Sequence, residues 1–163
     1  MPKIEPLPVA ALHNREGWLT EVSRGMEYLF KGFSLSKYRV TCGWPCVGAL
    51  SKARRVGECH GAKSSKDGVF ELFISPVLDD PLEVAGTVCH ELAHVAAGID
   101  ARHGSGFVKV CRHVGLTKGK PMSASPGPYL EERLGKLLLP LGPYPTPPCS
   151  LPASPKSRVR WCH

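Results

Sequence analysis

Two histidines and a glutamate in the middle of the chain have the spacing of a metal-dependent hydrolase. His90 and His94 are four positions apart, so on a helix both imidazoles project from one face and can bind one zinc ion. Glu91 lies between them, where its carboxylate can take a proton from a water at the metal and deliver it to a leaving amine. The purely structural alternative is a buried helix whose histidines form hydrogen bonds with their neighbours and bind no metal. The pattern favours metal-assisted peptide hydrolysis.

A third zinc ligand must come from elsewhere in the chain, because a catalytic site takes three protein ligands and leaves one position for water. We favour His103, since the loop 98–102 is long enough to fold it back toward the two histidines. Asp100 stays open as an alternative because a carboxylate also binds zinc, and Glu131 or Glu132 is a weaker one.

The helix that must hold these residues has the clearest boundaries in the sequence. Asp80 is an N-cap residue, Pro81 suits the first helical position, and Glu83 stands where a capping box needs a carboxylate. Gly98 can end the helix. The signals predict a helix over 81–97.

Hydrophobic periodicity and turn residues predict the remaining elements, and together they indicate an α+β fold with an N-terminal helix and a small antiparallel sheet. These elements are a helix over 10–32, a strand over 38–42, a hairpin of 56–60 with 69–75, a short helix over 107–114 and a helix over 129–138. We expect one domain over 1–139. Residues 140–163, which are rich in proline and basic residues, are expected to form a C-terminal tail.

Composition and charge limit the classes of protein to which this chain can belong. Of the 163 residues 42% are hydrophobic and 21% charged, which is typical of a globular protein and excludes collagen-like and disordered chains. The net charge of +7 makes nucleic acid a plausible partner. The basic clusters 52–55 and 156–160 are short and no base-reading motif accompanies them, so any DNA contact should be to phosphates.

Seven cysteines, an odd number at irregular positions, do not form a secreted disulfide framework. The N-terminus has no signal-peptide pattern and no run of 18 apolar residues occurs, so we expect a cytoplasmic protein without a membrane span. Cys42, Cys46, Cys59 and His60 can be pooled into a second metal site, although ordinary thiols are the favoured interpretation.

The motifs of residues 38–144 resemble those of the SprT-like zinc metallopeptidases, especially the short members from phages and mobile elements. The matching segments are Cys42-Gly43-Trp44-Pro45, Phe70-Glu71-Leu72-Phe73-Ile74-Ser75-Pro76, His90-Glu91-Leu92-Ala93-His94, and His103-Gly104 leading into Phe107. The resemblance implies a zincin-like fold with zinc held by His90, His94 and His103, and with Glu91 as the catalytic base. Better-studied relatives cleave proteins attached to DNA, so it also implies a protein substrate that can be DNA-associated.

The chain departs from the longer relatives at its C-terminal end. Those proteins carry a zinc ribbon of paired CxxC units, whereas only Cys149 and Cys162 are present here. We therefore expect one zinc ion per chain. The rival interpretation is a noncatalytic DNA- or protein-binding module stabilised by zinc. If the chain is an enzyme, Tyr129 is a candidate donor to the developing oxyanion, although a plain helix residue is the simpler interpretation.

Overall fold

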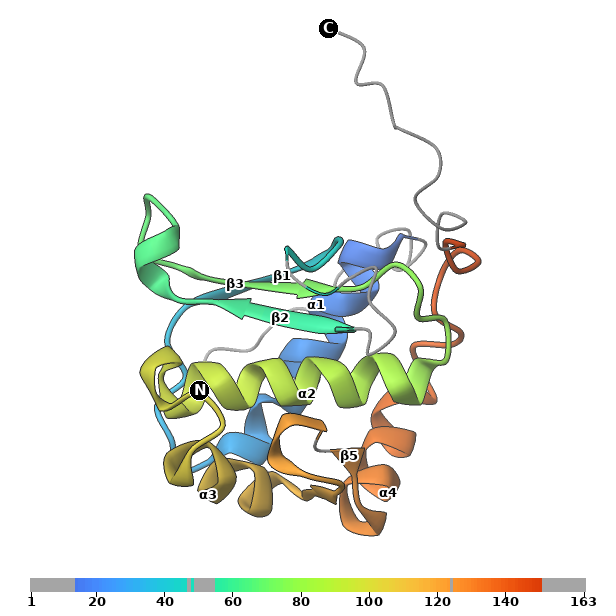
Figure 1. Ribbon diagram of the computed structural model, residues 1–163. Coiled ribbons are helices and arrows are strands. Elements are labelled where there is room, and N and C mark those ends of the chain that lie inside the picture. The colour runs from blue at the N-terminus through green and yellow to red at the C-terminus, as the bar shows by residue number, and fades with distance from the viewer. Residues whose placement is uncertain (1–13, 47, 49–54, 124, 151–163) are drawn as a thin grey trace, which may run out of the picture.

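A three-stranded sheet and a group of helices enclose one long central helix in the computed structural model, which describes residues 14–46, 48, 55–123 and 125–150. Figure 1 shows the sheet on one side of helix α2, with α3, α4 and a short β-ribbon on the other side and α1 crossing behind. The helices are α1 (Arg15–Met26), α2 (Pro81–Ala97), α3 (Ser105–Val114) and α4 (Pro128–Leu138). The strands are β1 (Tyr38–Cys42), β2 (Gly57–His60), β3 (Phe70–Ile74), β4 (Leu116–Lys118) and β5 (Ser125–Pro126). The α+β class expected from the sequence is confirmed.

Helix α2 begins and ends where its capping residues predict. The backbone N–H of Glu83 donates to the Asp80 carboxylate at 2.8 Å, and Pro81 occupies the first turn. Gly98 follows the last turn with φ of 82°, a conformation that favours glycine. Most apolar side chains of the helix are buried between the sheet and the other helices, so the core fixes its position; the fully buried ones are Val84, Ala85, Val88, Cys89, Leu92 and Ala93.

The three-stranded sheet has the order β1-β3-β2 and is mixed rather than antiparallel. Strands β2 and β3 form the expected antiparallel hairpin, with Cys59 opposite Leu72. Strand β1, however, pairs in parallel with β3, with Val40 opposite Leu72, so the expectation of a purely antiparallel sheet is wrong. After β1 the chain forms β2 at the far edge of the sheet, and β3 then takes the central position between them. An alternating pattern of side chains predicts that a segment is a strand, but it does not predict this order.

Helix α1 is shorter than the expected 10–32. It begins after Asn14, whose side chain accepts a hydrogen bond from the Gly17 N–H at 2.8 Å. After Met26 the chain tightens into a 3-10 turn, Glu27–Phe30. Residues 10–13 lie outside the described part of the chain.

The later helices follow the predictions closely, and one element is new. Helix α3 begins at Ser105 and ends before Gly115, which has φ of 96°, and α4 covers the expected 129–138. The β4–β5 ribbon was not predicted, because its strands are only three and two residues long. Among the described residues, every helix is too short or too polar to cross a bilayer.

The described part of the expected C-terminal tail, residues 140–150, packs on the domain. The buried Tyr144 ring meets Trp18 of α1 edge-on, with ring centroids 5.0 Å apart. The backbone N–H of Cys149 donates to the Pro76 carbonyl at 2.8 Å. Tyr144 therefore belongs to the core and Cys149 contacts the domain through its backbone, while residues 151–163 lie outside the described part.

Candidate metal centre

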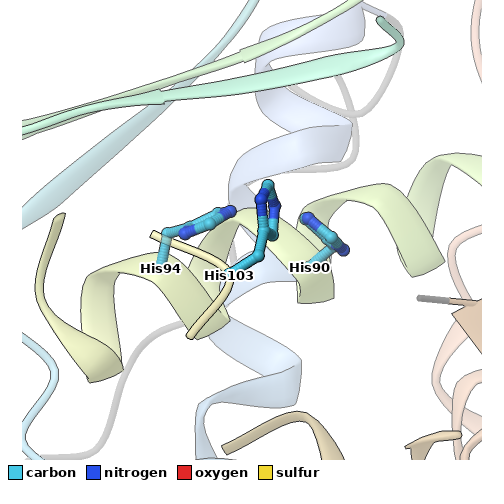
Figure 2. Close-up of side chains that lie close together, drawn as sticks. All are labelled: His90, His94 and His103. Carbon is cyan, nitrogen blue, oxygen red and sulfur yellow. The ribbon is translucent and has the colours of Figure 1, made fainter. Parts of the chain in front are cut away.

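Three histidines lie together against helix α2. His90 and His94 project from adjacent turns of the helix, and His103 reaches them from the loop before α3, as Figure 2 shows. One nitrogen from each ring lies within 4.8 Å of the others. The ring centroids are 5.2 Å apart for His90 and His94, 4.8 Å for His94 and His103, and 5.6 Å for His90 and His103. This cluster, called the histidine cluster below, could hold a metal ion.

A short loop with unusual backbone angles returns His103 to the helix. Gly98 has φ of 82°, and Arg102 has φ of 47°, which is rare for a residue with a side chain. Between them, Ile99–Ala101 form one 3-10 turn. Asp100, the alternative third ligand, is exposed in this turn and does not belong to the cluster.

Phe107 of α3 supports all three histidine rings. Its fully buried ring stacks on His94 with centroids 4.2 Å apart, and it lies 5.0 Å from both His90 and His103. By its spacing Phe107 is an ordinary core residue of a short helix, and the His103-Gly104 unit that precedes it does not predict its contact with all three rings. The structure shows it as an apolar platform that limits how the rings can turn.

The electrostatics of the cluster favour neutral imidazoles, the form that binds metal ions. Burial, together with the neighbouring His90 and His103, lowers the pKa of His94 to about 3. Burial and the nearby Arg55 also lower the pKa of His103. His94 Nδ1 and His103 Nε2 are buried and have no hydrogen-bond partner among the described residues. Three neutral imidazoles, each offering one nitrogen within 4.8 Å of the other two, form a donor set that fits zinc.

The Glu91 side chain lies against strand β2. It is only 5% exposed, and burial raises its pKa to about 8, with Glu58 acting in the same direction and Arg55 opposing. The backbone of Gly57 comes so close that a Cβ there would collide with Glu91 Oε1 and lie 2.7 Å from Thr87 Cγ2. A carboxyl group that titrates near neutrality can both accept and release a proton. Gly57, which motif reasoning missed, provides the space that this carboxyl occupies.

The histidines and Glu91 line a cleft of about 940 Å³. Strand β2, which is at the edge of the sheet as described, forms one wall, and the β4–β5 ribbon contributes to the opposite side. Charged groups of both signs line the cleft: Arg55, Arg102 and Lys118, and Glu58, Asp80, Glu83 and Glu131. The cleft is thus an open groove of mixed charge rather than a basic channel.

The other residues singled out in the sequence lie apart from the histidine cluster. Glu131 lines the cleft but forms an ion pair with Lys118, and Glu132 pairs on the surface with Lys136 at 2.6 Å. Tyr129 is exposed and does not line the cleft; the Arg133 guanidinium lies over its ring at 3.8 Å. Of the two basic clusters only Arg55 is described.

Comparison of the chain with protein-family models, with curated proteins and with solved structures found no match. A conclusion about function therefore depends on the residues of this chain and on the geometry that its fold gives them. The joint placement of three histidines and one buried glutamate in an open cleft is the feature that such a conclusion must explain.

Proposed function

We propose that the chain is a zinc-dependent metalloendopeptidase. The observation that carries the proposal is the convergence of His90, His94 and His103 in a cleft that also contains the buried Glu91. A structural zinc site is normally closed by four protein ligands and needs no carboxyl group beside it, whereas three ligands and a neighbouring glutamate are typical of catalytic sites.

The three histidines would hold the ion. When bound, zinc would supply a Lewis acid that lowers the pKa of a water molecule and polarises the substrate carbonyl. The platform formed by Phe107 keeps the imidazoles in place and excludes water from beneath them, since its ring is fully buried against all three. The protein thereby prepares the donor atoms before an ion arrives.

Glu91 would act as the general base and then as the general acid. Its carboxylate takes a proton from the attacking water, and the protonated form delivers that proton to the leaving amine. Burial raises the pKa of this carboxyl to about 8, so both forms are accessible near neutral pH. The missing side chain of Gly57 on β2 leaves the space in which this carboxyl lies.

The shape of the cleft supports an extended peptide as substrate. Strand β2 contributes its backbone to the wall beside Glu91 and is an edge strand of the described sheet. An extended chain can add to such an edge through main-chain hydrogen bonds, which depend little on the side chains of the substrate. A groove open at the surface suits cleavage within a chain.

DNA-associated proteins are the substrate class that the resemblance to SprT-like peptidases suggests. The net charge of +7 would favour such substrates by attraction to phosphates, even though the cleft itself carries both signs of charge. DNA binding of this kind should weaken steeply as salt increases. Affinity for DNA that is constant between low and physiological salt would contradict a phosphate-directed contact.

The decisive experiment compares the wild-type chain with Glu91→Gln. Both are loaded with zinc and incubated with an unfolded protein and with a DNA-bound protein, and peptide products are identified by mass spectrometry. Because glutamine keeps the size of the side chain but cannot accept the proton, hydrolysis should fall by roughly 10²-fold or more with zinc content unchanged. Glu132→Gln, on the surface outside the cleft, is the matched control and should keep full activity.

Two results would contradict the peptidase proposal. Unchanged hydrolysis in Glu91→Gln would show that this carboxyl is not the base. A zinc-loaded wild-type chain that cuts neither substrate but binds one of them would instead support the zinc-stabilised binding module.

A further inference from the structure

A second group of metal-ligand side chains lies outside the histidine cluster. Cys46, Glu58 and His60 each offer one ligand atom, and these three atoms lie within 4.8 Å of one another. Cys46 Sγ is 3.9 Å from His60 Nε2, and His60 Nε2 is 3.6 Å from Glu58 Oε2. We call these three residues the thiol cluster.

Strand β2 separates the thiol cluster from the histidine cluster. Successive side chains of a strand point to opposite faces, so Glu58 and His60 share one face. Gly57, on the other face, lies against Glu91, as described above. On the face of the thiol cluster, Phe73 of β3 supports His60 edge-on with ring centroids 5.4 Å apart. The side chains of Glu58 and His60 therefore alternate with Gly57 along this short strand, and Glu58 also borders the cleft of the histidine cluster.

The contacts of Glu58 direct one carboxylate oxygen into the thiol cluster. Arg55 Nη1 donates to Oε1 at 3.1 Å, whereas the Cys46 backbone N–H donates to Oε2 at 2.5 Å. The first contact anchors the carboxylate, and the second holds Cys46 beside the strand. Oε2 is also the oxygen that faces His60. The side chain is thus oriented by its neighbours, as metal-ligating carboxylates commonly are.

We propose that Cys46, Glu58 and His60 bind a zinc ion, independently of the histidine cluster. Tetrahedral coordination with metal–ligand bonds of about 2.0–2.3 Å places ligand atoms about 3.3–3.6 Å apart, so the observed spacings need only a small contraction. Thiolate and imidazole donors together favour zinc over magnesium or calcium, which prefer oxygen ligands alone. Three protein ligands leave the fourth position to water.

The proposed site differs from the pooled one considered in the sequence. Cys46 and His60 belong to it, but Cys42 and Cys59 do not: the Cys42 thiol contacts the Arg15 guanidinium at 3.5 Å, and Cys59 lines the cleft beside Glu58. The acidic ligand, Glu58, was not considered. With this site the chain holds two zinc ions, in place of the one expected from its sequence.

Cobalt distinguishes the two clusters, because only the thiol cluster contains a sulfur ligand. The full chain is freed of metal, kept reduced with a non-chelating reductant and titrated with Co²⁺. We expect two ions per chain, visible-region bands from both sites, and a near-ultraviolet charge-transfer band that reports a thiolate–cobalt bond. Zn²⁺ added afterwards should remove this band.

Matched cysteine variants make the test specific. Cys46→Ser should abolish the near-ultraviolet band and reduce the stoichiometry from two ions to one, with the visible bands of the histidine cluster retained. Cys149→Ser, which changes another exposed cysteine, should keep the band and both ions. The proposal is overturned if the wild-type chain shows no thiolate band, if the band survives in Cys46→Ser, or if Cys149→Ser removes it. None of these results depends on peptidase activity.

Discussion

The histidine cluster and the thiol cluster differ in the kind of element that supplies two of their three donors, a buried helix in one and an edge strand in the other. In the histidine cluster, two of the three rings come from one buried helix whose core contacts fix its position. In the thiol cluster, two donors come from an edge strand of four residues and the third from an exposed cysteine. The first site is held by the core of the protein, whereas the second is held at the rim of the sheet.

This difference implies different sensitivities. A site within a packed helix should lose affinity mainly when a ligand is removed, because the remaining donors keep their geometry. A site at a sheet edge depends on contacts such as the one between Cys46 N–H and Glu58, which order the donors one by one.

The largest expected effect concerns His103, the one ligand of the histidine cluster that comes from a loop. His103→Ala should lower zinc affinity at this cluster by more than about 100-fold, since even groups one shell further out can change affinity by 10–100-fold. Competition with a chelator of known affinity measures the change. The thiolate–cobalt band of the thiol cluster should persist in the same variant.

Asp100→Ala is the control for His103→Ala. Asp100 is exposed in the same loop and lies outside the cluster, so zinc affinity should stay at the wild-type value. If Asp100→Ala loses zinc while His103→Ala retains it, the third ligand has been assigned wrongly.

An intermediate effect is expected at Gly57, on the strand that separates the clusters. A methyl group there would displace the Glu91 carboxyl and press on Thr87 Cγ2 at 2.7 Å. Because misplacing a catalytic group by about 1 Å can cost roughly 100-fold in rate, Gly57→Ala should lower peptidase kcat by about 10- to 100-fold. Zinc affinity at the histidine cluster should stay unchanged, as equilibrium dialysis can verify.

Gly135→Ala is the matched control for Gly57→Ala. A Cβ added at this exposed position of α4 would meet no side chain or neighbouring element among the described residues, and alanine has the higher helix propensity. Activity should be unaffected and the free energy of unfolding should rise slightly. An equal loss of activity in both variants would contradict the positioning role of Gly57.

The smallest expected effect is at the start of α2. Asp80→Ala removes the acceptor for the Glu83 N–H and should lower the free energy of unfolding by about 1 kcal/mol. Zinc affinity should hardly change, because His90 lies about three turns further along the helix. Urea denaturation and zinc competition give the two quantities; Asn14→Ala, which uncaps α1, should show a similar loss of stability.

Sequence reasoning succeeded where the chemistry follows one helical period. The capping residues predicted the ends of α2, and the spacing of His90 and His94 placed both rings on one face. The sequence also favoured His103 as the third donor, and in the structure its ring lies beside the other two.

Local patterns could not reveal contacts between elements distant in the sequence. The parallel pairing of β1 with β3 depends on which strand takes the centre of the sheet. The platform at Phe107 and the space at Gly57 depend on how α3 and β2 pack against α2. The same holds for Glu58, which gains its partners only when β2 lies beside the loop that carries Cys46.

The contacts of residues 140–150 have a consequence for the order in which the chain folds. Arg15 donates to the Pro147 carbonyl at 2.6 Å across a separation of 132 positions, and the buried Trp18 rests on Tyr144. Contacts so distant along the chain require the closure of a long loop, which slows folding. During synthesis the indole of Trp18 on α1 lacks its contact with Tyr144 until that residue has left the ribosome. Completion of the core therefore waits for these residues, and before they are made the nascent chain exposes an apolar surface that chaperones can bind.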